Sequence, residues 1–281
     1  MKTLSDLQEA YTEAGLLELF NELKQYARNS IVIEVDREFE PEEVGMSRFG
    51  GSPDLPPDLE WFNNPSSGAA LSFVAQINCA ECHDFDLDNQ LPDHGILYFF
   101  YDLVASPWGF APEDDAGSLV YFYDGPIEKL KKRACPSDIA CFSSSALIFS
   151  NQIDLPEYSS WLVEHTLSDA EYERYLDLHD ELGLDVDHKL LGHSNNIQKG
   201  MELQCELVSK GIDCGSAEAY HDLRVAELAP ARFDWRLLFQ ISSYDDDDME
   251  WGDDGSLYFW IRTEDLAAKR FDRAWPILRS F

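Results

Sequence analysis

Apolar residues near the start of the chain recur at helical spacing. They fall three, four or five positions apart, at Leu4, Leu7, Tyr11, Leu16, Leu19, Leu23 and Tyr26. This spacing predicts an amphipathic helix over 4–28, with a weak point at Gly15. We expect residues 1–30 to pack as a helix on the body of the protein.

Short runs with β-branched or aromatic residues follow and predict strands. They cover 31–35, 71–77, 96–102, 119–123 and 146–149. In the run 71–77, Leu71, Phe73, Ala75 and Ile77 alternate onto one face, whereas 96–102 is apolar almost throughout and should be buried on both faces. Three further helices are expected: 169–182 between Ser168 and Gly183, 201–210 ending at Gly211, and 264–271 after Thr263.

The second half of the chain echoes the first. Gln76-Ile77 followed by Gly95-Ile96-Leu97-Tyr98-Phe99 is matched by Gln240-Ile241 followed by Gly255-Ser256-Leu257-Tyr258-Phe259, and Phe49-Gly50 has a weaker echo in Leu191-Gly192. We interpret this as one domain over 31–281, made of two related halves at about 31–130 and 140–281. The alternative is that Gly-x-Leu-Tyr-Phe is a pattern common in unrelated β-strands, so that the match does not indicate a repeat. The predicted fold class is α+β, with a mixed, mostly antiparallel sheet flanked by a few helices.

Charge changes the picture of what this protein can bind. The 281 residues hold 54 acids and 21 bases, for a net charge of −33. Such a surface repels nucleic-acid phosphates and anionic lipid, so we expect neither nucleic acid nor membrane as a partner. The same field attracts a basic protein, although solubility alone is a sufficient explanation for acidity. A hydrophobic content of 44% still requires a folded chain.

The N-terminal residues lack the pattern of a secretion signal, and no apolar run is long enough to span a membrane. We therefore expect a cytoplasmic protein whose six cysteines are reduced.

Several motifs resemble sites but fail on inspection. Cys79-Ala80-Glu81-Cys82-His83 fits haem attachment, yet no second Cys-x-x-Cys supports zinc and no export signal supports haem. Residues 84–95 begin like a calcium loop but have Asn89 and Gly95 where Gly and Glu are needed. Residues 192–196 lack the closing glycine of a nucleophile elbow and follow no evident strand. We expect no catalytic residues, no metal and no cofactor, and the chain is more plausibly not an enzyme.

Two sets of residues remain as binding candidates. The first is a partner-binding patch in which aromatics lie among acids: Trp108, Asp245, Asp246, Asp247, Asp248, Glu250 and Trp251. Its alternative is a solvated, self-repelling hairpin tip. The second is a ligand cleft between the halves lined by Arg48, Gly50, Gly51, Gln76 and Gln240, where glycines would let a ligand approach backbone N–H groups. Its alternative is a purely structural corner.

Segments spread over most of the chain resemble the YwqG-like family, a bacterial family of unknown function. They include Phe49-Gly50-Gly51-Ser52-Pro53, Leu71 to Asn78, Gly95 to Asp102, Trp235 to Ile241 and Trp251 to Ile261. The resemblance implies an α+β fold with two related halves and brings no catalytic residues. Some family members are thought to accompany secreted-toxin gene clusters, which would suit an immunity role. The sequence thus predicts first an acidic module that binds a basic protein, and second a small-molecule binder or undiscovered enzyme using the cleft.

Overall fold

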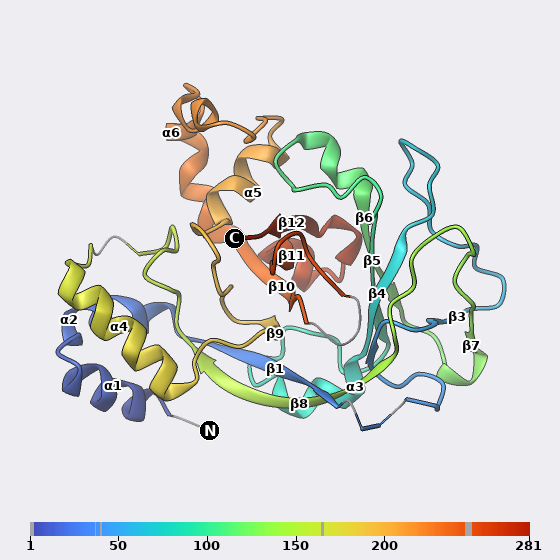
Figure 1. The fold of residues 1–281 in the computed structure, drawn as a ribbon, viewed down its shortest axis with the longest axis horizontal. Helices are drawn as coiled ribbons and strands as arrows, with labels where there is room; N and C mark the ends of the chain where they lie inside the picture. Colours follow the sequence, from blue (N-terminus) through green and yellow to red (C-terminus); the bar gives the residue numbers. More distant parts are fainter. Residues whose placement is uncertain (1–2, 37, 40, 164–165, 245–248) are drawn as a thin grey trace.

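The computed structural model describes residues 3–36, 38–39, 41–163, 166–244 and 249–281. They form an α+β fold in which a ten-stranded sheet curls into a nearly barrel-shaped layer flanked by helices (Figure 1). The strand order is β12-β11-β10-β9-β1-β8-β2-β4-β5-β6, and every pairing in the described part is antiparallel. The predicted α+β class is confirmed.

Two long strands form the middle of the sheet and run along the bottom of Figure 1. β1 (Arg28–Asp36) pairs with β8 (Ser145–Asp154) over nine residue pairs. Four strands extend the sheet on the β8 side: β2 (Arg48–Phe49), β4 (Ser72–Asn78), β5 (Ile96–Tyr101) and β6 (Ser118–Tyr123). Four more extend it on the β1 side: β9 (His188–Leu191), β10 (Trp235–Ser242), β11 (Ser256–Arg262) and β12 (Trp275–Arg279). A separate ribbon pairs β3 (Asp54–Leu55) with β7 (Lys131–Lys132).

The five strands expected from the sequence are all present, although β8 extends five residues beyond its predicted end. β9, which directly precedes Gly192, was not predicted from the sequence. Its Lys189 is a charged residue at a position that is only 1% exposed. The polar pattern therefore hid a strand that is buried because its lysine is paired inside the protein.

Three helices gather on one side of the molecule in Figure 1: α1 (Leu4–Glu13), α2 (Leu17–Leu23) and α4 (Asp169–Leu182). The single helix predicted over 4–28 is wrong, because Gly15 takes a φ of +72° and β1 already begins at Arg28. α4 begins after Ser168 and ends at Gly183, as predicted.

The remaining helices are short: α3 (Cys79–Cys82), α5 (Glu202–Ser209), α6 (Val225–Leu228) and α7 (Thr263–Ala267). The predicted helix 264–271 is too long, because Lys269 adopts a left-handed φ of +56°. Helical turns of the 3₁₀ type cover Lys24–Tyr26, His83–Phe85, Pro112–Gly117, Ile127–Lys129, Ala217–His221, Ala229–Asp234 and Phe271–Arg273. No helix in the described ranges combines the length and apolarity that crossing a membrane requires.

The four strands on the β8 side form the first flank of the sheet and the four on the β1 side form the second. Both flanks contribute to one aromatic core. Phe99 of β5 lies 4.5 Å from Phe239 of β10 and 5.1 Å from Phe259 of β11, measured between ring centroids. Phe49 of β2 contacts Phe239 at 5.9 Å. Burying rings of this size stabilises the fold by about 1.5–3 kcal/mol each, so the two flanks stabilise one another.

The two flanks also share an irregularity. The β4–β5 register shifts between Phe73 and Ala75, and the β10–β11 register shifts between Leu237 and Phe239. A bulge of this kind bends a strand and re-aims the side chains beyond it.

A glutamine follows each bulge. Gln76 lies opposite Tyr98 and pairs on its other side with Arg48; Gln240 lies opposite Tyr258 and pairs on its other side with Lys189. This register makes Leu190, one residue before the predicted Leu191, the counterpart of Phe49.

We predict that Gly50→Ala destabilises the protein more than Gly68→Ala. Both glycines have positive φ, but a Cβ at Gly50 would lie 2.1 Å from the carbonyl oxygen of Ser143, whereas a Cβ at Gly68 meets nothing within 4 Å. Gly68→Ala should lower the unfolding free energy by about 1 kcal/mol, and Gly50→Ala by about 2–4 kcal/mol because overpacking adds to the backbone strain. Urea denaturation measures both, and equal losses would contradict the packing argument.

Candidate functional site

Arg48 and Gln76, two of the predicted cleft residues, form a buried, hydrogen-bonded cluster of polar side chains with Asp54. We call such a cluster a polar knot. Arg48 Nη2 lies 2.6 Å from Asp54 Oδ2, and Gln76 Nε2 donates to the same oxygen at 2.8 Å. Gln76 Oε1 accepts from the Asp54 backbone N–H at 2.8 Å. All three residues are 0% exposed. Their polar groups hold the loop after β2 and face the protein interior.

Gly50 and Gly51 form the turn above this knot, with φ values of +58° and +69°. The Gly50 N–H donates to the carbonyl of Val74 and the Gly51 N–H to that of Phe142, both at 2.8 Å. Neither amide is left for a ligand, so this turn is a structural corner.

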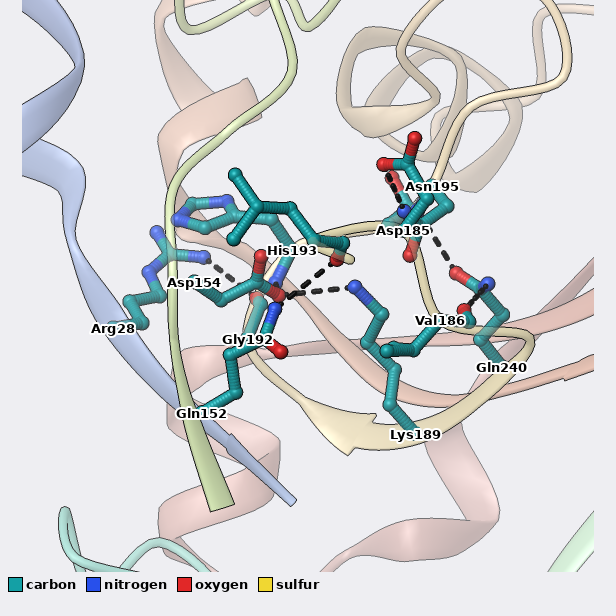
Figure 2. Close-up of polar contacts among 12 residues, drawn as sticks. Arg28, Gln152, Asp154, Asp185, Val186, Lys189, Gly192, His193, Asn195 and Gln240 are labelled. Carbon is teal, nitrogen blue, oxygen red and sulfur yellow. Dashed lines mark hydrogen bonds and ion pairs between the residues drawn. The ribbon is translucent and has the colours of Figure 1, made fainter. Parts of the chain in front are cut away.

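Gln240, the fifth predicted cleft residue, organises an equivalent knot in the other flank (Figure 2). Its Oε1 accepts from the Asn195 backbone N–H at 2.9 Å, and its Nε2 donates to the Val186 carbonyl at 3.2 Å. The Tyr258 hydroxyl donates to the Asn195 carbonyl at 2.6 Å, as the Tyr98 hydroxyl donates to the Asp54 carbonyl. Asn195 therefore stands in this flank where Asp54 stands in the first.

An uncharged residue at that place changes the ion pairing. Lys189 cannot pair with Asn195 as Arg48 pairs with Asp54, and its Nζ instead lies 3.1 Å from Asp154 Oδ2, on β8. Figure 2 shows Lys189 and the His193 backbone converging on Asp154, where the His193 N–H donates at 2.9 Å. Burial holds the pKa of His193 well below its ordinary value, and its Nε2 donates to the Tyr26 carbonyl at 2.7 Å. The lysine charge is thus neutralised inside the protein.

A cavity of about 310 Å³ lies beside Gln240, and its charged side chains are acidic. Its acidic side chains are Glu157, Asp185, Asp187 and Asp254, and its other lining side chains are neutral. Among the described residues no lysine, arginine or histidine lines it. We call it the acidic cavity.

The carboxylates of the acidic cavity perturb one another. Burial raises the pKa of Glu157 to about 8, and the charge of Asp185 adds to this. Burial and the charge of Asp254 raise the pKa of Asp187. The His179 hydrogen bond, in contrast, lowers the pKa of Asp185. A cation in the cavity would favour the ionised form of every one of these groups.

The acidic cavity also contains an acceptor without a donor. Asn195 Nδ2 donates to Asp185 Oδ1 at 2.9 Å, which fixes the side-chain amide. Its buried Oδ1 has no hydrogen-bond partner within the part of the chain that is described. A buried acceptor left unpaired is costly, and a donor entering the cavity could satisfy it.

The predicted partner-binding residues are divided between surface and core. Trp108 is 40% exposed and stacks on Phe110, and Glu250 is exposed. Trp251 is 1% exposed and packs edge-on against Tyr101 and Phe142, so it is a core residue and cannot anchor a partner at the surface. Asp245, Asp246, Asp247 and Asp248 lie outside the described residues.

The cysteine motif packs in the interior. Cys79 and Cys82 are fully buried, and burial raises the pKa of Cys79 to about 12, which leaves an unreactive thiol. Nowhere in the described ranges do three His, Cys, Asp or Glu side chains come together as a metal site.

Sequence reasoning missed the carboxylates of the acidic cavity. Asp185 and Asp187 alternate just before β9, which was the signal for two side chains on one face of an extended segment. Asp254 belongs to the acidic run before β11. Glu157 offers no signal, because only the fold brings the segment after β8 to this place.

We predict that Glu157→Gln flattens the pH dependence of stability. Unfolded Glu157 titrates near its ordinary pKa of 4.5 but folded Glu157 near 8, so the folded state holds the extra proton between these values. Stability from this group is therefore full below about pH 4.5 and is lost as pH rises towards 8. Urea denaturation at intervals across this pH range measures the free energy of unfolding. That free energy should fall less steeply with pH in Glu157→Gln than in the wild type, and as steeply as in the wild type in the control Glu250→Gln. A decline as steep as that of the wild type would contradict the raised pKa.

Comparison with known families finds a match that assigns no activity. The family model described as "Domain of unknown function (DUF1963)" matches residues 47–279. This span includes both knots and every lining residue of the acidic cavity except Phe281. A search of curated proteins found no match. Because the match covers most of the chain, the protein belongs to the DUF1963 family.

Proposed function

We propose that this protein is a binding module that receives a lysine or arginine side chain of a basic partner protein in the acidic cavity. The observation that carries the proposal is a cavity with four acidic side chains and no base among its described lining residues. A guanidinium or ammonium group would favour the ionised form of Glu157, whose pKa burial raises to about 8, and would supply the donor that Asn195 Oδ1 lacks.

An organic cation suits the cavity better than a metal ion. The described carboxylates do not converge as metal ligands do. The walls also hold serine hydroxyls and amide groups, including Ser242, Ser243 and Asn196. Such neutral groups accept hydrogen bonds from the several N–H donors of a guanidinium or ammonium ion.

The net charge of −33 attracts a basic partner over long range. A field of this sign speeds the encounter with a basic protein, with an on-rate that falls steeply as salt is added. The exposed Trp108 and Glu250 extend the surface available to such a partner. The resemblance to the YwqG-like family, and through it to toxin-associated proteins, suggests a basic toxin as the partner class.

We further propose that the halves 31–130 and 140–281 derive from one duplicated unit and form a single domain. The matched bulges, the paired glutamines and the shared aromatic core support this origin. The cysteines are free thiols, which supports a reducing compartment such as the cytoplasm.

The binding proposal predicts that Asp187→Asn combined with Asp254→Asn weakens binding of a tri-arginine amide probe. Two lost charges beside a bound guanidinium should reduce the affinity about tenfold at low salt and flatten its salt dependence. Asn tolerates the left-handed φ of +48° at position 254, so the fold should survive. Fluorescence anisotropy of a labelled probe measures both effects.

The matched control is Asp58→Asn combined with Glu60→Gln, two exposed acids in the other flank. This control changes the net charge equally without touching the acidic cavity. Equal weakening in both double variants would mean that the probe senses only overall charge, and the proposed site would be wrong.

A further inference from the structure

A second cavity, of about 500 Å³, lies where α5 and the 217–221 turn cover β12. Its described lining residues include no aspartate or glutamate, although acids outnumber bases 54 to 21 in the chain. It includes three basic residues: Lys199, His221 and Arg279. The charge of this cavity is opposite to that of the protein as a whole.

Arg279 is the central feature of the cavity. It is only 5% exposed, and its guanidinium contacts neutral acceptors: Nη1 donates to the Leu278 carbonyl at 3.1 Å and Nη2 to Gln204 Oε1. Gln204 is itself held in this orientation because its Nε2 donates to the Gly109 carbonyl at 2.8 Å. Within the described ranges Arg279 forms no ion pair.

Other buried lysine and arginine side chains have the carboxylate partner that Arg279 lacks among the described residues. Arg48 is paired with Asp54 and Lys189 with Asp154, both wholly inside the protein. Removing a cation from water without a counter-ion is among the costliest arrangements in a protein. Burial accordingly lowers the pKa of Arg279.

Aromatic rings form the rest of the wall. The Arg279 guanidinium lies over the Phe110 ring, 4.7 Å from its centroid. Trp161 and Tyr220 lie nearly parallel, with centroids 6.2 Å apart and planes 16° apart, and both are partly exposed. Flat rings beside a fixed cation match a ligand with a planar apolar body and one negative charge.

We propose that this cavity binds a small planar organic anion, with Arg279 as the counter-ion and Trp161 and Tyr220 as the walls for its ring. The anionic group is a carboxylate or a phosphate, both of which a guanidinium can bind through two parallel hydrogen bonds. Lys199 and His221 lie exposed at the cavity and add to the attraction. The inference is independent of the proposed protein partner, because no lining residue is shared between the two cavities.

The test compares indoleacetate with its neutral amide, indoleacetamide, by isothermal titration calorimetry on the full chain. The acid should bind at least about tenfold more tightly than the amide, because only the acid neutralises the buried guanidinium. Adenosine monophosphate forms a second arm: tighter binding than indoleacetate assigns the anionic group as phosphate, and weaker binding assigns it as carboxylate.

Arg279→Met should abolish the preference for the acid over the amide, while the amide keeps its affinity. Lys199→Gln, at an exposed position, should lower the affinity for the acid by a smaller factor and leaves the core intact. It also serves if Arg279→Met does not fold. Equal binding of acid and amide by the wild type, failure of all three probes to bind at millimolar concentration, or an unchanged acid preference in Arg279→Met would each overturn the proposal.

Discussion

The hydrogen bond from the Asn195 backbone N–H to Gln240 Oε1 is the interaction on which both cavities depend. Gln240 follows the bulge in β10, and its side-chain amide holds the chain on both sides of β9, through the Val186 carbonyl before it and the Asn195 N–H after it. From that point residues 195–197 line the acidic cavity and residues 198–200 line the second cavity, which contains Arg279. Gln198 Nε2 then ties the segment to the Ser280 carbonyl at 3.3 Å. One anchored segment thus separates two cavities of opposite charge.

The sign of each cavity follows from which charges are already paired inside the protein. Arg48 and Lys189 are neutralised by buried carboxylates, so neither contributes to a field at the surface. Arg279 keeps its charge because its partners are neutral. No described base lines the acidic cavity, although His179 contacts Asp185 at its edge at 3.3 Å. The net charge of −33 therefore governs how a charged ligand is attracted from a distance. The ion pairs inside the protein decide which charges remain available to bind it.

Local patterns in the sequence predicted the elements but not the sites. Ser168 and Gly183 bounded α4 correctly because capping is decided by a few neighbouring residues. Gln76 and Gln240 stood out because equivalent strands carry them, although only the hydrogen bonds reveal that they hold loops rather than a ligand. Trp251 was misjudged because its acidic neighbours in the sequence are not its neighbours in space, where Tyr101 and Phe142 surround it. Arg279 gave no signal, since an unpaired buried charge is defined by long-range contacts.

Asp54 and Asn195 occupy equivalent positions in the two flanks, and the difference between them changes what surrounds each. In the first flank the Asp54 carboxylate neutralises Arg48 and also accepts from Gln76, so the loop closes over a sealed knot. In the second flank an amide at the equivalent position cannot neutralise Lys189, which turns to Asp154 on β8 instead. Asn195 Oδ1 has no described hydrogen-bond partner, as Asp54 Oδ1 has none in the first flank, but Asn195 lines a cavity. Of the acids in that cavity, Asp185 contacts His179, whereas Glu157, Asp187 and Asp254 form no ion pair with the described residues. Exchange of a carboxylate for an amide, on otherwise equivalent backbone, therefore distinguishes the closed corner of the first flank from the acidic cavity of the second.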